Sequence, residues 1–511
     1  MARITLTERT ARALSYRLLG SVLDVGLSLA LGIVLARILP PEEFGLFGVA
    51  VSIVAIAELL GNCGMLRALI QRKDLTPEHE SAAVIFQFSA ALLLSMLLFF
   101  SATVLSAWFN MPGLAIILQL QPVILLIHAT ALLPEARLTR RLAFDRMTLI
   151  QALTRALGGG VSILAAIHGL GALALVLGSI VTAATRAVLL WSNAPGFMPL
   201  KFHYSYFRPL FSFGSAVSIT NIVNLLAQRL DVLIIARLVG SGGVGLYQRA
   251  IQMALLPLSQ MTGPVNKVLF PAMSSVQDAP ERFRRGYLAT VRFSTLVAFP
   301  VLTVLWATAD ILVPFVYGPM WENAVPIVQV VCIAGVFRVL TNSQGLVAQA
   351  QGRAKAEAAR QLLWLTLVLV FGILGSRGGV FGVAIGVCFA TFIFLVSMTR
   401  LALPLAGVPF FMWLQGMRSG VIGCTFMGLS IVFTKNFLIG LPNFVLLIVL
   451  GCVGLAMYVA IIRFSLSAED TKFANSVSRI LPNRLGLLFR LVLGIKSSEA
   501  LAGEVPGKIL A

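Results

Sequence analysis

The sequence predicts an all-α protein that crosses a membrane about fourteen times. Three observations predict this fold class: the composition, the length of the apolar runs and the distribution of positive charge between loops. Of 511 residues, 58% are hydrophobic and only 12% are charged, and the mean hydropathy is +0.94. A soluble domain carries about 25% charged residues. The composition therefore excludes a soluble enzyme, a disordered chain and a disulfide scaffold.

The apolar runs are long and continuous, and each approaches the roughly 20 residues that span a bilayer as a helix. They lack the short alternating segments of a membrane β-barrel. The loops between them are shorter than the roughly 50 residues of a folded domain, so we expect function within the helices or at the two membrane faces. The predicted spans are 18–38, 43–64, 83–107, 113–134, 147–167, 170–192, 210–238, 244–272, 292–317, 324–349, 358–375, 379–403, 418–434 and 440–462.

Positive charge predicts the orientation. The net charge is +19, from 39 Lys and Arg against 20 Asp and Glu. With the amino terminus in the cytoplasm, most of these cations fall on the cytoplasmic side, and the opposite side holds only Arg37, Arg237, Arg377 and Lys435. This bias follows the positive-inside rule and places both termini in the cytoplasm. No basic run is interleaved with aromatic residues, so we expect no nucleic-acid partner.

An internal repeat divides the helices into two lobes. Residues 33–47 read IVLARILPPEEFGLF and residues 233–247 read LIIARLVGSGGVGLY. At an offset of 200 the identical pairs are Ala36/Ala236, Arg37/Arg237, Gly45/Gly245 and Leu46/Leu246. Six helices separate the copies, so both copies point the same way, which indicates two parallel six-helix lobes, a common plan of transporters.

This repeat sets the predicted domain boundaries. The last two helices are an appendage, and the tail contains LPNRLGLLFRLVLGIK (481–496), which suits a helix on the inner leaflet or a solvated tail. The predicted parts are a cytoplasmic amino terminus 1–17, a first lobe 18–195, a cytoplasmic linker 196–209, a second lobe 210–405, two further helices 406–463 and a cytoplasmic tail 464–511.

The predicted substrate site consists of charged residues in the second lobe. An ionisable residue inside the bilayer is costly, so it usually faces a cavity or another charge. Cations outnumber acids here, and a cation-lined cavity attracts an anion such as a diphosphate. Alternatively, these side chains are paired and hold the structure together, or extend to the interface. The predicted residues are Arg229, Arg249, Lys267 and Arg338, with Asp231 orienting Arg229.

Asp24 and Glu58 are the candidate intramembrane acids of the first lobe, on neighbouring helices. A carboxylate in such a cavity can bind a proton or a cation, so we expect one of them to couple transport to an H⁺ or Na⁺ gradient. The alternative is an acid that is merely hydrogen bonded or interfacial.

No motif predicts an enzyme or a cofactor. The chain has no P-loop, GxSxG or HExxH, and its outer loops are short. The five cysteines form no CxxC and the four histidines are scattered, so we expect no disulfide, metal or cofactor.

Two segments resemble a known family. ARILPPEEFGLFGVAVSIVAIAELLGNCGMLRALIQR (36–72) and DVLIIARLVGSGGVGLYQRA (231–250) resemble two signatures of bacterial polysaccharide transporters, which belong to the multidrug/oligosaccharidyl-lipid/polysaccharide exporter superfamily. The resemblance spans roughly residues 15–405, and the predicted number of fourteen helices also matches this family.

The resemblance implies a flippase of the bacterial inner membrane. Its substrate would be an undecaprenyl-diphosphate-linked oligosaccharide for O-antigen, capsule or exopolysaccharide, moved by alternating access through the cationic cavity. Its partners would be membrane lipid and a polysaccharide polymerase and co-polymerase. Two alternatives remain open, namely another lipid-precursor or drug exporter of the superfamily, and a membrane-embedded polymerase or ligase.

Overall fold

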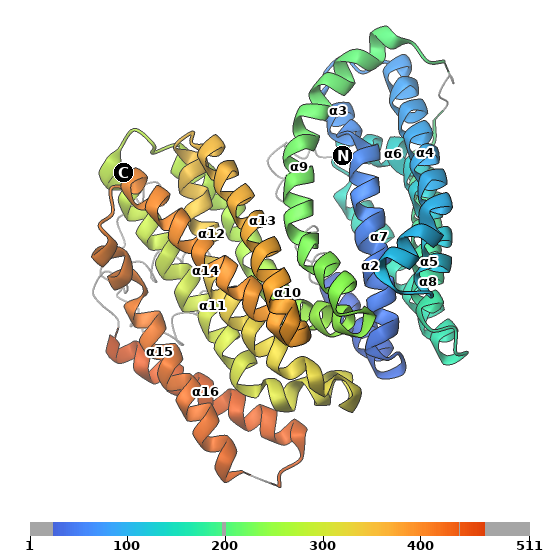
Figure 1. Ribbon diagram of the computed structural model, residues 1–511. Coiled ribbons are helices and arrows are strands. Elements are labelled where there is room, and N and C mark those ends of the chain that lie inside the picture. Colours follow the sequence, from blue (N-terminus) through green and yellow to red (C-terminus); the bar gives the residue numbers. More distant parts are fainter. Residues whose placement is uncertain (1–23, 197–200, 439, 466–511) are drawn as a thin grey trace, which may run out of the picture. The chain divides into compact units, whose positions relative to one another are not determined.

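The computed structural model describes residues 24–196, 201–438 and 440–465 (Figure 1), and within these ranges the regular structure is helical, without strands. Ten segments of this part are long and apolar enough to cross a membrane. The segment Ala354–Ala406 contains two long helices, α13 (Ala354–Gly375) of 22 residues and α14 (Gly379–Ala406) of 28 residues. The ten do not include the helix over residues 24–38, α9 (Tyr204–Leu238) or α10 (Ser241–Ser274). The all-α membrane fold is confirmed, whereas the total of about fourteen spans stays a prediction.

Several helices extend beyond their predicted apolar spans. α4 is Pro77–Phe109, α9 begins at Tyr204 and α11 is Pro280–Tyr317, whereas the spans predicted for them begin at 83, 210 and 292. Hydropathy detects only the part of a helix that lies in hydrocarbon. Backbone hydrogen bonding continues the helix into the polar interface, so these helices are six or more residues longer at one end than their apolar cores.

The chain divides into two compact units, Met1–Gln248 and Arg249–Ala511. The first unit contains α2 (Pro41–Asn62), α3 (Met65–Gln71), α5 (Leu114–Leu120), α6 (Val123–Arg140), α7 (Phe144–Ile167) and α8 (Ala172–Asn193), besides α4 and α9. α9 packs against α2, α3 and α4. The packing boundary therefore lies inside α10 and not at the predicted linker 196–209, and the predicted lobe boundaries stay a proposal. The predicted amino terminus 1–17 and the tail helix 481–496 lie outside the described residues.

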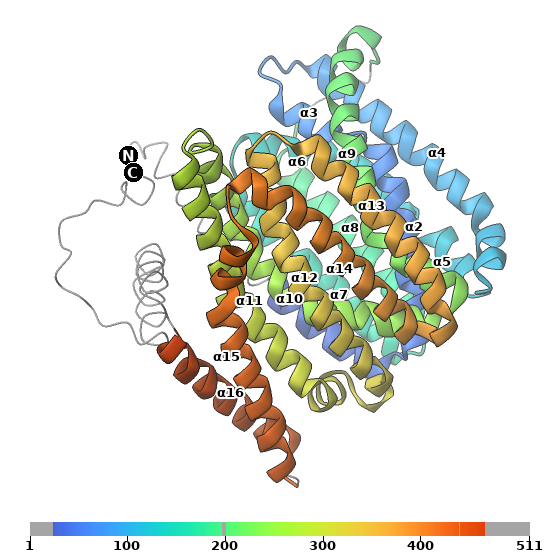
Figure 2. The same ribbon diagram turned by 60° about the vertical axis from the view of Figure 1, so that its left-hand side comes forward.

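In the second unit, α11 contacts α12 (Val325–Ala350), α15 (Phe410–Phe437) and α16 (Asn443–Ser465). α15 and α16 run side by side in both views (Figures 1 and 2). A short 3₁₀ helix, η1 (Pro319–Ala324), joins α11 to α12. The two helices predicted as an appendage thus pack on α11.

Glycines bring neighbouring helices close together. A Cβ on Gly158 of α7 would lie 1.8 Å from Thr182 Oγ1 of α8, and a Cβ on Gly178 of α8 would lie 1.8 Å from Ser162 Oγ of α7. Small residues of this kind let helix backbones approach within a membrane, where lipid is as apolar as the helix surface and water adds no driving force.

The two copies of the sequence repeat contact each other through equivalent positions. A Cβ on Gly45 would lie 1.7 Å from the carbonyl oxygen of Ser241, and a Cβ on Gly245 would lie 1.9 Å from that of Pro41. Each contact becomes the other when 200 is added or subtracted, as expected for two copies related by a local two-fold axis. Only glycine leaves room for this backbone contact.

Candidate functional site

Glu58 lies in a polar pocket between three helices of the first unit. It lies one turn before Asn62, on the same face of α2. Gln87 of α4 and His128 of α6 complete the polar lining, and the remaining walls include Ala57, Gly61, Ala91, Leu94 and Leu125. His128 Nδ1 lies 2.8 Å from Glu58 Oε1, and Gln87 Nε2 donates to Asn62 Oδ1. The predicted coupling acid therefore belongs to a cluster that holds one carboxylate.

Asp24 lies elsewhere in the first unit. Its Oδ1 is 2.6 Å from Arg155 Nε, so the helix over residues 24–38 is joined to α7 by an ion pair. The side chain of Asp24 is only 20% exposed. This ion pair agrees with the alternative that the sequence left open, in which the acid is only hydrogen bonded or interfacial. The role of Asp24 in ion coupling stays a prediction.

Arg229 and Asp231 lie two residues apart on α9 and do not pair. Asp231 instead accepts hydrogen bonds from the Tyr247 hydroxyl, at 2.9 Å, and from the Val232 backbone N–H, at 2.8 Å. Residues two apart on a helix do not face each other, and the role of Asp231 in orienting Arg229 stays a prediction. Arg229 is half-buried, and no described residue is in ion-pair or hydrogen-bond contact with it.

Arg249, at the start of the second unit, is held by its neighbours. It is 8% exposed, and Nη1 donates to Gln252 Oε1 at 2.7 Å. Its Cζ lies 5.8 Å from the ring centre of Tyr317 and 6.0 Å from that of Trp321. These cation–π contacts stabilise the charge where water is excluded. Arg249 thus anchors α10 to the end of α11 and to η1.

Arg338 is half-buried in the middle of α12. Its Cζ lies 5.8 Å from the ring centre of Trp364 on α13, and within the described ranges it has no carboxylate partner. Lys267, the remaining predicted cation, lies outside the residues whose side chains are described. Because Arg229 and Asp231 belong to the first unit and Arg249 and Arg338 to the second, the cation-lined cavity stays a prediction.

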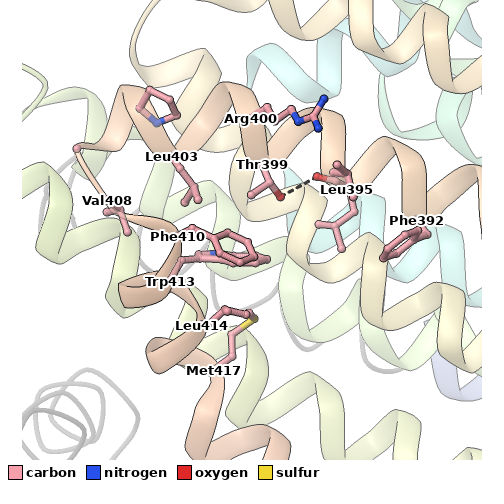
Figure 3. A pocket seen from close by; sticks show the side chains of 13 residues that line it. Phe392, Leu395, Thr399, Arg400, Leu403, Val408, Phe410, Trp413, Leu414 and Met417 are labelled. Carbon is pink, nitrogen blue, oxygen red and sulfur yellow. Dashed lines mark hydrogen bonds between the residues drawn. The ribbon is translucent and has the colours of Figure 1, made fainter.

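An apolar groove of about 810 Å³ runs between α14 and α15 (Figure 3). The rings of Phe410 and Trp413 lie on one side of it, tilted by 35° with centres 5.7 Å apart, and Leu395 and Leu403 line the other side. Arg400 is the one charged residue among the thirteen that line the groove, and it is exposed. The α14–α15 groove can hold a hydrocarbon chain beside a cation.

Sequence reasoning missed His128, Gln87 and the α14–α15 groove. His128 and Gln87 are polar residues within otherwise apolar spans, a signal that was available because such residues are expensive in hydrocarbon. The groove left no signal, because its apolar lining is indistinguishable in sequence from lipid-facing surface.

Comparison with known proteins adds an independent finding. The family described as "Polysaccharide biosynthesis protein" matches residues 34–326. The lipopolysaccharide biosynthesis protein WzxC of Escherichia coli (strain K12) is 25% identical over 389 residues, covering 75% of this chain and 78% of that protein. The succinoglycan biosynthesis transport protein ExoT of Rhizobium meliloti (strain 1021) is 24% identical over 471 residues, 90% of this chain and 94% of that protein.

Solved structures agree on the fold. The lipid II flippase MurJ in an inward closed conformation superposes with a TM-score of 0.67 at 14% identity, covering 87% of this chain and 97% of that one. An inward-facing multidrug-resistance transporter of the MATE family gives a TM-score of 0.57 at 16% identity, covering 75% and 94%. At this identity the likeness establishes the architecture only.

Proposed function

The chain belongs to the polysaccharide biosynthesis protein family, in which it is a multi-pass membrane transport protein and not an enzyme, and from this premise we propose that it is a flippase for lipid-linked oligosaccharides. The substrate is an undecaprenyl-diphosphate-linked repeat unit destined for O-antigen, capsule or exopolysaccharide. It crosses the inner membrane by alternating access through a cationic cavity.

The observation that carries this proposal is the pair of unneutralised guanidinium groups in apolar helices. Arg229 and Arg338 are half-buried, and within the described residues neither faces a carboxylate. An ionisable residue inside a membrane protein is by default a candidate for a substrate pathway. Guanidinium binds phosphate oxygens with paired hydrogen bonds, which suits a diphosphate. Lys267 would add a third positive charge, and Arg249 would support the aromatic cluster beside it.

The α14–α15 groove supports the lipid part of the proposal. Its lining is apolar and it opens beside Arg400, at the end of α14 that the charge distribution predicts to be cytoplasmic. A polyprenyl chain can lie there while its diphosphate meets the cations.

The transport cycle draws on an ion gradient, through Asp24 or Glu58. Glu58 is better suited, because the Asp24 carboxylate is already neutralised by Arg155. The protein lies in the inner membrane with both termini in the cytoplasm, among membrane lipids and beside a polysaccharide polymerase and co-polymerase.

The test is a deletion strain in which lipid-linked repeat units are extracted and their leaflet is determined. We expect them to accumulate on the cytoplasmic leaflet and to be cleared by the wild-type chain. Arg229→Ala and Arg338→Ala should clear them at least about tenfold more slowly, a loss of one charge-assisted contact. Arg338→Lys should retain part of the rate because it retains the charge.

Arg284→Ala is the matched control, because Arg284 pairs with Glu281 one turn away at the surface, at 2.8 Å. Normal clearance by both alanine variants would show that the site assignment is wrong. A strain without accumulation would favour a drug exporter, and an inviable deletion would favour a peptidoglycan-precursor flippase. Chain growth by the purified protein would favour a polymerase.

A further inference from the structure

We propose that the pocket between α2, α4 and α6 binds one Na⁺ ion through oxygen atoms of Glu58, Asn62 and Gln87. His128 is a positioning residue that holds the Glu58 carboxylate. The inference deepens the proposed function, because it names the coupling ion and its site, and its coupling role rests on that function. Binding itself is measurable without transport.

The first step is an acceptor without a partner. Gln87 is 4% exposed, and its Nε2 donates to Asn62 Oδ1, yet its Oε1 is buried and has no hydrogen-bond partner among the described residues. A buried carbonyl oxygen without a donor is costly. A cation in the pocket that Gln87 lines would satisfy it.

The second step is the set of donor atoms. His128 Nδ1 engages Glu58 Oε1, which leaves Oε2 for a ligand. Asn62 Oδ1 accepts one hydrogen bond and retains a second lone pair. The three side chains thus offer carboxylate and amide oxygens, which suit a hard cation. A transition metal would find too few ligands, because no group of three or more His, Cys, Asp or Glu side chains lies together among the described residues.

The third step is charge and size. Glu58 is the one acid among the nine residues that line the pocket, so a single positive charge balances it. A divalent ion would leave an uncompensated charge among apolar helices, which is unfavourable. The free volume is about 10 Å³, room for about one small ion or water molecule.

The fourth step is access. Glu58 and His128 are 32% and 31% exposed, whereas Gln87 is buried. An ion can therefore reach Glu58 first and then be enclosed by the amides, whose small neighbours Ala57, Gly61 and Ala91 leave the space. A site that is partly open in one state can exchange its ion during a transport cycle.

The experiment measures binding of radioactive Na⁺ to the purified full-length chain, at fixed pH with choline as the background cation. We expect saturable binding, loss of binding in Glu58→Gln, and at least about tenfold weaker binding in Gln87→Leu. His128→Ala should weaken binding, and His128→Asn, whose amide N–H can replace Nδ1–H, should restore it.

The matched control is Glu135→Gln, which removes a carboxylate from the same helix as His128 but one paired with Arg186 at 2.8 Å. It should bind Na⁺ like the wild type. Gel filtration of each variant establishes that it is folded.

Absence of Na⁺ binding by the wild-type chain would overturn the proposal, as would binding that survives Glu58→Gln. Proton uptake without Na⁺ binding would also overturn it. Failure of the proposed function is a separate result, because a deletion strain without lipid-linked accumulation leaves the measured Na⁺ site intact.

Discussion

Asp24 and Arg155 show how a charge inside the bundle is accommodated at the level of single residues. Their side-chain atoms lie 2.6 Å apart, and Asp24 is 20% exposed against 38% for Arg155. Removing one partner leaves the other charge in a poorly solvated place. Removing both leaves neither charge behind, which is less costly.

Arg155→Leu should therefore destabilise the protein by about 1–2 kcal/mol, a modest value because water partly screens Arg155. The Asp24→Asn/Arg155→Leu double variant should lose less than the sum of the single variants. Thermal unfolding of the purified protein in detergent measures this. Losses that simply add would show that the two side chains do not interact energetically.

Contacts between whole elements depend on glycines, and the most symmetrical case joins the two repeat copies. Gly45 lies against the Ser241 backbone and Gly245 against the Pro41 backbone. Neither backbone can move aside without displacing the start of a helix, since α2 begins at Pro41 and α10 at Ser241.

Gly45→Ala and Gly245→Ala should therefore lower the melting temperature, although alanine is favoured over glycine in a helix by roughly 0.5–1 kcal/mol. Gly160→Ala is the opposite case, because Gly160 lies within α7 with open space around its Cβ position. It should raise the melting temperature or leave it unchanged. The same sign of change for Gly45→Ala and Gly160→Ala would argue against close packing at the repeat.

At the scale of the whole molecule, the charge distribution predicts the orientation of the chain in the membrane. Arg377 lies in the turn between α13 and α14, on the side predicted to be outside, and Arg353 lies between α12 and α13, on the side predicted to be inside. Direction of transport depends on this orientation.

Alkaline phosphatase, which is active only outside the cytoplasm, should be active when fused after Gly378 and inactive when fused after Gly352. A fluorescent protein fused to the carboxyl terminus should fluoresce, because that end is predicted to be cytoplasmic. The reverse pattern of phosphatase activity would invert the assigned orientation and with it the direction of flipping.

The membrane helices, the equivalent repeat segments and the exceptional charges could all be predicted from the amino-acid composition and from the spacing of residues along the sequence. Long apolar runs predict membrane helices because an exposed backbone polar group has no partner in lipid. The 200-residue repeat also predicts which segments are equivalent, and the structure brings these segments together at Gly45 and Gly245. Intramembrane acids and cations were recognisable as exceptional, because each is costly in hydrocarbon.

Which side chain meets which was decided only by tertiary structure. Asp24 pairs with Arg155, Glu58 contacts His128, and Asp231 accepts a hydrogen bond from the Tyr247 hydroxyl. Partners on different helices depend on the rotation of each helix about its axis, and a nearly uniform apolar sequence does not specify that rotation. In the folded chain, the close approach of helix backbones fixes this rotation. The ion pairs, the polar pocket and the apolar groove could therefore be identified only from the tertiary structure.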